Sequence, residues 1–273
     1  WGMAMFGRHE LVWLNADGWR SARASALPAH AEALGRWQRQ DWPLVARRRD
    51  GDAGAEEVCL GLPLPPDAEG GNKVRIALRV NRRGVARHAA PLPLAALFPA
   101  ATRNDQAPAG SARPEVAQTD SAPVGSAAPD AGPMATAPSG MALTDIVFSG
   151  AAPSPWPDLL TGLARDAGSL PLRVYGSLAM QALTGLPYVT GRSDIDLLAY
   201  PATGRQLHAA LALLSRYATC LPLDGELIFP SGQAVSWKEW LQTTLSQSRV
   251  LVKGAHAVHL AAPQTLLATL EQL

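Results

Sequence analysis

The stretch VYGSLAMQALTGLPYVTGRSDIDLL, residues 174–198, decides how the rest of the chain is interpreted. A short apolar strand over Leu172–Tyr175 is expected to stop at Gly176-Ser177, because glycine interrupts regular structure. An apolar run with helical spacing follows and is ended by Gly185 and Pro187. The order strand, Gly-Ser turn, helix and second strand is therefore predicted for this stretch.

Two aspartates, Asp194 and Asp196, lie two residues apart in the second strand. Side chains alternate between the faces of a strand, so both carboxylates point the same way while Ile195 and Leu197 pack behind them. Carboxylates aimed at one point repel each other unless a cation lies between them, and Mg²⁺ prefers oxygen ligands. We therefore expect Asp194 and Asp196 to bind magnesium.

The Gly176-Ser177 turn lies where a strand leads into a helix, so its free N–H groups and hydroxyl can hold phosphate. A phosphate site beside paired carboxylates is typical of metal-assisted nucleotidyl transfer. Each motif alone is common. Gly-Ser often only caps a helix, and Asp-x-Asp also marks solvated strand ends and the metal sites of glycosyltransferases.

The same region resembles a known family, the malonate decarboxylase holo-acyl-carrier-protein synthases, or phosphoribosyl-dephospho-CoA transferases, of the nucleotidyltransferase superfamily. The residues that carry the resemblance are Tyr175 to Ala179, Gln181 to Tyr188, Ser193-Asp194 and Asp196 to Leu198, with Arg8-His9 before an apolar strand near the start. The resemblance implies transfer of phosphoribosyl-dephospho-CoA from its triphosphate precursor to a serine of the acyl-carrier subunit of malonate decarboxylase, with release of pyrophosphate. It also implies that Ser177 and its neighbouring amides hold the outer phosphates.

A third carboxylate normally completes such a site and comes from the neighbouring strand. Asp224 and Glu226 are available on one face of the strand expected over Leu223–Phe229. The apolar-Asp-x-x-apolar pattern favours Asp224 as catalytic residue and metal ligand, with Glu226 as the alternative. A charged turn beside a strand is the competing explanation for both.

Composition limits the remaining classes of function. The chain has 273 residues, a formal net charge of +1 and two cysteines, Cys59 and Cys220, in apolar contexts. A near-neutral chain gives no general reason to expect nucleic acid as a partner, and two distant cysteines are typical of reduced thiols in the core of a cytoplasmic protein. No apolar run approaches the ~18 residues that a membrane span needs.

The expected fold class is α+β, with three parts. Residues 1–100 form a small, mostly antiparallel β-containing domain that is mildly basic, with fourteen Lys and Arg against ten Asp and Glu. Residues 101–150 form a flexible linker rich in Ala, Pro, Ser and Gly, because such a composition cannot bury enough apolar surface to offset its ordering entropy. Residues 151–273 form a nucleotidyltransferase-type mixed sheet with helices. Smaller expectations are a turn at Asp17-Gly18, a half-buried strand over Lys73–Asn81, a helix capped by Ser154, an amphipathic helix over Arg205–Tyr217 and a last helix over Pro263–Leu273.

Other polar residues are weaker candidates. Arg8, His9 and Lys253 could contact a ribose or a phosphate, although strand-end polar residues explain them equally well. His256 and His259 are three apart and are poor metal partners in a strand. Other classes of function also remain open, namely a magnesium-dependent nucleotidyltransferase acting on a small molecule, a protein or an RNA end, and a non-catalytic carrier-binding module.

Overall fold

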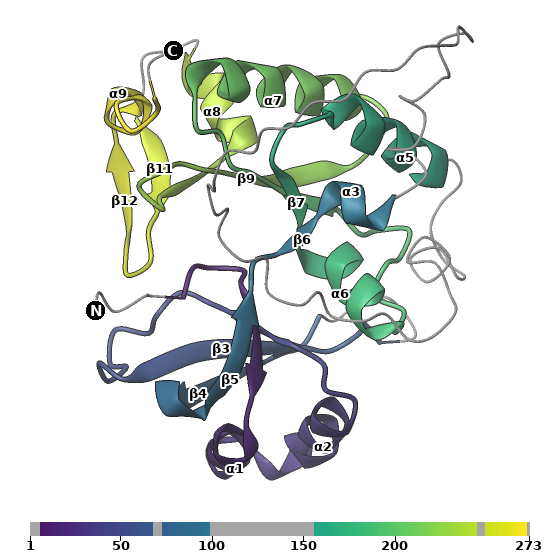
Figure 1. The fold of residues 1–273 in the computed structure, drawn as a ribbon, viewed down its shortest axis with the longest axis vertical. Coiled ribbons are helices and arrows are strands. Elements are labelled where there is room, and N and C mark those ends of the chain that lie inside the picture. Colours follow the sequence, from purple (N-terminus) through teal and green to yellow (C-terminus); the bar gives the residue numbers. More distant parts are fainter. Residues whose placement is uncertain (1–5, 68–72, 99–155, 245–248, 272–273) are drawn as a thin grey trace, which may run out of the picture.

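The computed structural model describes residues 6–67, 73–98, 156–244 and 249–271. It confirms the α+β class, because helices pack on two separate sheets (Figure 1). The flexible linker and the Ser154 cap were predicted for residues that lie outside the described ranges. Within those ranges, no helix combines the length and the apolarity needed to cross a bilayer.

The first sheet has five strands in the order β4-β3-β2-β1-β5, and each pair is antiparallel. Its strands are β1 (Leu11–Leu14), β2 (Leu44–Ala46), β3 (Glu57–Pro63), β4 (Arg75–Asn81) and β5 (Val85–Ala89). The helical segments between them are α1 (Ala16–Ser25), η1 (Pro28–His30), α2 (Ala31–Arg39) and η2 (Arg82–Gly84). In β4 the alternation of buried Ile76, Leu78 and Val80 with more exposed residues is the half-buried pattern expected from the sequence.

Helices α1 and α2 cover one face of this sheet (Figure 1). Their buried residues Trp19 and Trp37 belong to the same hydrophobic cluster as Leu60 and Leu78 of the strands. The predicted turn at Asp17-Gly18 is wrong, because both residues lie inside α1. Gly18 is needed for packing instead, since a Cβ there would come within 2.2 Å of the carbonyl oxygen of Gly84.

The second sheet has seven strands in the order β12-β11-β10-β9-β8-β7-β6. Its strands are β6 (Leu92–Pro93), β7 (Leu172–Val174), β8 (Ile195–Ala199), β9 (Leu223–Ile228), β10 (Ala234–Ser236), β11 (Val250–Lys253) and β12 (Val258–Ala261). The pair β8–β9 is parallel and the other pairs are antiparallel, so the sheet is mixed as expected. The helices are α3 (Leu94–Leu97), α5 (Trp156–Ala167), α6 (Gly176–Thr184), α7 (Gly204–Tyr217), α8 (Trp237–Thr244) and α9 (Pro263–Leu267).

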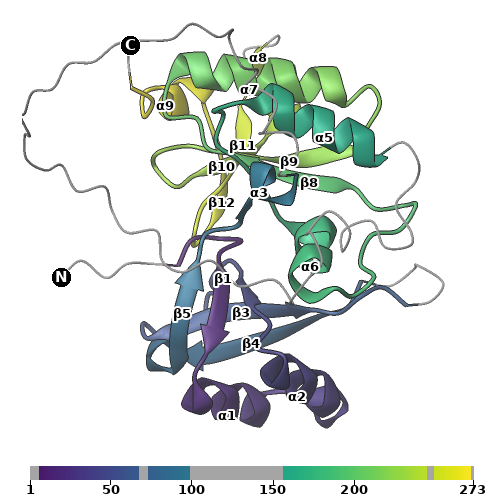
Figure 2. The ribbon, with the colours of Figure 1, turned by 45° about the vertical axis from the view of Figure 1, so that its right-hand side comes forward.

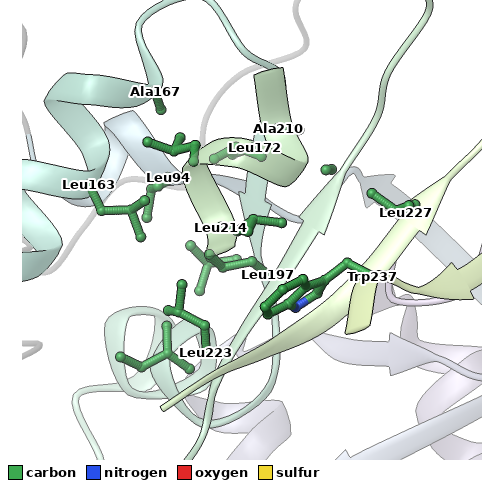
Figure 3. Close-up of a cluster of buried hydrophobic side chains, with 14 of the residues drawn as sticks. Leu94, Leu163, Ala167, Leu172, Leu197, Ala210, Leu214, Leu223, Leu227 and Trp237 are labelled. Carbon is green, nitrogen blue, oxygen red and sulfur yellow. The ribbon is translucent and has the colours of Figure 1, made fainter. Parts of the chain in front are cut away.

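The core of this half lies between the sheet and the helices α5 and α7 (Figure 3). Leu197 of β8 and Leu223 and Leu227 of β9 point into it. Helix α6 lies on the other side of the sheet, facing the first sheet (Figure 2). Because strand side chains alternate, the residues between these leucines, Asp196 and Glu226 among them, point toward α6 and the first sheet.

Several sequence expectations need adjustment. Leu92–Phe98 lie in the range assigned to the first domain, yet β6 pairs with β7 and Leu94, Leu97 and Phe98 are buried in the second core. The last helix ends at Leu267 instead of Leu273, and Glu271 forms a bridge with Thr203. Cys59 is buried, whereas Cys220 is exposed and is therefore not a core thiol.

The two halves contact each other directly. Met180 and Tyr188 belong to the second half in sequence but pack into the hydrophobic cluster of the first half. The Tyr188 hydroxyl donates a hydrogen bond of 2.8 Å to the carbonyl oxygen of Pro63. The space between the two sheets is thus bounded by residues from both.

Candidate active site

The Gly-Ser turn lies where β7 leads into α6, as predicted. Gly176 has φ +68, a left-handed conformation that favours glycine. A Cβ on Gly176 would come within 2.0 Å of Asp196 Oδ2, so the carboxylate of Asp196 rests against the bare α-carbon. The glycine is therefore required both by the backbone conformation and by the position of the carboxylate.

The first turn of α6 presents unsatisfied backbone N–H groups. No side chain caps this end, because the N-cap residue is Tyr175 and its side chain accepts no bond from the helix. Gly176 and Ser177 both line a cavity of about 600 Å³ between the two sheets. The Ser177 hydroxyl has no hydrogen-bond partner among the described residues, and this end of α6 is suited to an anion.

The parallel register of β8 and β9 sets Asp196 directly beside Asp224. Gly225, the residue after Asp224, has φ +143, and a Cβ there would come within 1.8 Å of the carbonyl oxygen of Leu197. This glycine therefore allows the two strands to pair at the point where the carboxylates meet. Asp194 lies one residue before the start of β8 and is exposed.

The environment of Asp196 disfavours its charge. Burial raises the pKa of Asp196 to about 6, and the negative charges of Asp224 and Asp194 add to the effect. The positive charges of Lys73 and Arg75, which come from the first sheet, act in the opposite direction. A carboxyl group with a raised pKa beside further carboxylates is typical of a functional site.

Glu226 lies two residues further along β9 in a different environment. Its side chain is 4% exposed and receives hydrogen bonds from Lys253 Nζ at 2.8 Å and Arg8 Nη2 at 3.1 Å, while His9 Nε2 lies 3.4 Å away. Burial alone would raise the pKa of Glu226, but these hydrogen bonds and charges outweigh it and lower the pKa. The structure thus brings Arg8, His9 and Lys253 together around Glu226.

His9 is held in the same cluster. Burial lowers its pKa despite the hydrogen bond to Glu226, and its ring packs against that of Tyr175 with centroids 4.2 Å apart. Its φ of +71 is rare for a residue with a side chain. This strained backbone position aims His9 at the second sheet.

Nowhere in the described part of the chain do three His, Cys, Asp or Glu side chains lie close enough to form a ready metal site. The structural basis for a cation is therefore the pair Asp196 and Asp224, with Asp194 near enough to influence the charge of Asp196. The oxygen donors and the raised pKa of Asp196 fit a hard divalent cation, because such an ion would neutralise the repulsion between the carboxylates. His256 and His259 take no part in this arrangement.

The motif between Gln181 and Ser193 positions the loop before β8. The Gln181 side chain accepts hydrogen bonds from the backbone N–H groups of Tyr188 at 2.9 Å and Val189 at 2.8 Å. The Ser193 hydroxyl accepts another from Thr190 N–H at 3.0 Å. These bonds fix the chain that leads into Asp194 and Asp196.

Sequence reasoning missed three cations near the carboxylates. Lys238 Nζ lies 3.8 Å from Asp224 Oδ1, and Lys73 and Arg75 act on Asp196 across the cavity. The alternation of Lys73, Arg75 and Arg79 on one side of the predicted strand was visible in the sequence. What it could not show was that this side faces the second sheet.

Comparison with known proteins finds relatives that match both halves of the chain. Residues 143–264 match the phosphoribosyl-dephospho-CoA transferase MdcG C-terminal domain, and residues 7–91 match the N-terminal domain of the same family. A protein from Xanthomonas campestris pv. campestris (strain 8004), named phosphoribosyl-dephospho-CoA transferase, is 34% identical over 268 residues, covering 96% of this chain and 97% of the relative. A protein of the same name from Bradyrhizobium diazoefficiens is 35% identical over 238 residues, covering 85% of this chain and 81% of the relative. No solved structure is significantly similar to the chain.

These relatives and the family match define the protein as a transferase enzyme. More narrowly, the chain belongs to the phosphoribosyl-dephospho-CoA transferase family.

Proposed function

We propose that this protein transfers phosphoribosyl-dephospho-CoA from the corresponding triphosphate to a serine of the acyl-carrier subunit of malonate decarboxylase, in the cytoplasm and with release of pyrophosphate. The observation that carries the proposal is the register of β8 and β9, which places Asp196 beside Asp224 and against the Gly176-Ser177 turn. Membership of the family supplies the chemical identity of the transferred group.

The reaction balances as a phosphoryl substitution. The serine oxygen of the carrier forms a bond to the phosphorus next to the ribose, and the bond from that phosphorus to the next bridging oxygen breaks. The leaving group is pyrophosphate, and the serine proton passes to a base. Mg²⁺ held by Asp194, Asp196 and Asp224 would supply positive charge to the phosphates.

The chain's own residues have distinct parts in this proposal. The N–H groups of Gly176 and Ser177 and the Ser177 hydroxyl hold the outer phosphates at the start of α6. Asp224 is 47% exposed in its side chain, so the carrier's serine can reach it, and we assign its carboxylate as acceptor of the serine proton. Glu226 is the poorer third ligand, because Arg8, His9 and Lys253 already surround its carboxylate.

The test is a transfer assay with the apo carrier subunit, Mg²⁺ and the triphosphate precursor, followed by mass spectrometry of the carrier. The wild type should add the mass of phosphoribosyl-dephospho-CoA and release pyrophosphate. Asp196→Asn should lower the rate by about 1,000-fold or more, because charge placed at the reacting phosphorus provides most of the catalysis in such reactions. Asp17→Asn is the matched control, since Asp17 is 75% exposed on α1 and lies on the far side of the first sheet.

Each failure has a different meaning. Full transfer by Asp196→Asn would refute the assignment of the carboxylate pair. If the wild-type enzyme leaves the carrier unmodified but labels a small molecule or another protein, that molecule is the acceptor in place of the carrier. Carrier binding without any transfer would make the protein a binding module.

A further inference from the structure

The face of the first sheet opposite α1 and α2 forms the floor of the cavity. Val45 of β2 pairs with Gly61 of β3, and Gly61 pairs with Ala77 of β4, so the three lie in one row across the sheet. All three line the cavity. A Cβ on Gly61 would meet only the carbonyl oxygen of Val45, at 3.8 Å, so the small side chains in this row leave the space open.

The cavity wall is rich in cations. Its lining includes Arg8, Arg47, Arg48, Lys73, Arg75 and Lys253. Among the described residues that line it, Asp50 is the one with an acidic side chain. Arg47 is paired with Asp50, and Arg8 and Lys253 are paired with Glu226. Lys73 and Arg75 have no ion-pair partner among the described residues, and Arg8 Nη1 is buried without a hydrogen-bond acceptor.

The unpaired cations and the start of α6 border the same cavity. Gly176, against which the Asp196 carboxylate rests, lines the same cavity as Lys73 and Arg75. A ligand carrying phosphates can therefore contact the start of α6 and the side chains of Lys73 and Arg75 at the same time.

The rim of the cavity is apolar. Val74, Leu251 and Val258 are 45%, 39% and 40% exposed, and all three line the cavity. Large apolar side chains left open around a concave site favour a ligand with an organic portion as well as charges. The cavity volume of about 600 Å³ is sufficient for a nucleotide with an extended arm.

From these observations we infer that the open face of the first sheet binds the dephospho-CoA portion of the substrate. Lys73 and Arg75 pair with its phosphates, the Val45-Gly61-Ala77 row leaves room for the nucleoside, and the apolar rim contacts the pantetheine arm. The inference rests on the proposed function for the identity of the ligand. It gives the N-terminal half a role in substrate binding, which the family match by itself does not assign to any residue.

The experiment measures binding of dephospho-CoA by calorimetry in EDTA, where no transfer can occur. The wild type should bind. Gly61→Leu should lose about tenfold or more in affinity because its side chain would fill the floor, whereas Gly61→Ser should stay within about threefold. Lys73→Ala and Arg75→Ala should each lose about tenfold, with a weaker dependence on salt, while Arg20→Ala, a cation exposed on α1, should bind as the wild type does.

The outcomes separate the two proposals. Asp196→Asn should still bind dephospho-CoA although it cannot transfer the group. No binding by the wild type, or equal binding by Gly61→Leu, Lys73→Ala and Arg75→Ala, would overturn the inference and leave the proposed function standing. Weakened binding by these three variants, together with a carrier that the wild-type enzyme leaves unmodified, would leave the inference standing and overturn the proposed function. If Gly61→Leu fails to fold, the two cation variants decide the matter.

Discussion

At the scale of single residues, two carboxylates on one strand face have different environments. Asp224 is half-exposed beside Asp196, whereas Glu226 is buried among Arg8, His9 and Lys253. A buried carboxylate with several cations around it is costly to neutralise, because the cations would be left without compensation. The sequence offered both residues as the third metal ligand, and these environments are the reason we propose Asp224 over Glu226.

Asp224→Asn should lower the maximal transfer rate by about 100-fold or more while the melting temperature stays within a few degrees of the wild type. Glu226→Gln should instead destabilise the fold by about 3 kcal/mol, because the neutral amide cannot balance the buried cations. Thermal melting and transfer at saturating Mg²⁺ measure the two effects. A stable but inactive Glu226→Gln enzyme would show that Glu226, and not Asp224, is the ligand.

Gly176 offers a second test at this scale. Gly176→Ala should reduce transfer by about 100-fold, because the methyl group would displace Asp196 Oδ2, and a loss of that order is common for misplaced catalytic groups. Gly185→Ala is the matched control, since Gly185 also has a positive φ of +70 but ends α6 away from the carboxylates. Gly185→Ala should lower the free energy of unfolding by about 1 kcal/mol and leave the transfer rate unchanged at temperatures below the melting temperature of the variant. Equal rates for both variants would mean that Gly176 serves only the turn.

The candidate site residues could be named from the sequence, but their surroundings could not. Spacing alone indicated that Asp194 and Asp196 share a face and that Gly176-Ser177 begins a helix. It could not indicate that Asp224 lies beside Asp196, because the pairing of β8 with β9 depends on strand order. Nor could it show that Arg8, 218 residues away from Glu226 in the chain, forms an ion pair with it.

At the scale of elements, a cluster of charges joins the ends of β2, β3 and β4. Arg47 forms a two-bond ion pair with Asp50, and Arg79 Nε donates to Asp50 at 2.9 Å. Arg79 also pairs with Asp52 at 2.6 Å. The hydrogen bond from Arg47, followed by that from Arg79, lowers the pKa of Asp50 to about 2 against the opposing effect of its burial.

This cluster should make the free energy of unfolding depend on pH in the acidic range. The pKa of Asp50 is lower in the folded protein than its ordinary 3.8, so its contribution is present above about pH 4 and is lost as the pH falls toward 2. The expected contribution is about 1 kcal/mol, because the side chain is 27% exposed and solvent screens the pair. Asp50→Asn should show that loss at pH 7 and a flatter stability profile between pH 4 and 2, with Asp17→Asn as control. Parallel profiles for Asp50→Asn and the wild type would contradict this assignment.

Elements with clear periodicity were predicted and those fixed by tertiary contacts were not. The alternation in β4 and the helical spacing of α7 identified both elements from the sequence. Helix α1 was missed because Asp17-Gly18 is a common turn signal, while the structure uses Gly18 to approach Gly84. Strand β5 was missed because its residues are mostly exposed and its pairing with β1 gives no local pattern.

At the scale of the whole molecule, the two sheets share a hydrophobic cluster and an ion-pair cluster. Tyr188 is 3% exposed among residues of the first half, although it belongs to the loop that leads into β8. Arg8 and His9 reach in the other direction, from the first half to Glu226 of the second. The cavity exists only while both sets of contacts hold the sheets together.

Unfolding should therefore be cooperative across both halves, and Tyr188 is the residue that tests it. Calorimetry of the wild type should show one transition. Tyr188→Ala should cost about 3–5 kcal/mol, because it removes a buried aromatic ring, and should separate the melting of the two halves into two transitions. Tyr188→Phe keeps the ring and loses only the hydrogen bond to Pro63, so it should cost about 1 kcal/mol and keep the single transition. A single transition in Tyr188→Ala would show that the ion pairs around Glu226 are sufficient to couple the halves. In that case Arg8→Ala and His9→Ala together in the Tyr188→Ala background should produce the second transition, since Arg8 and His9 are the residues of the first half that contact Glu226.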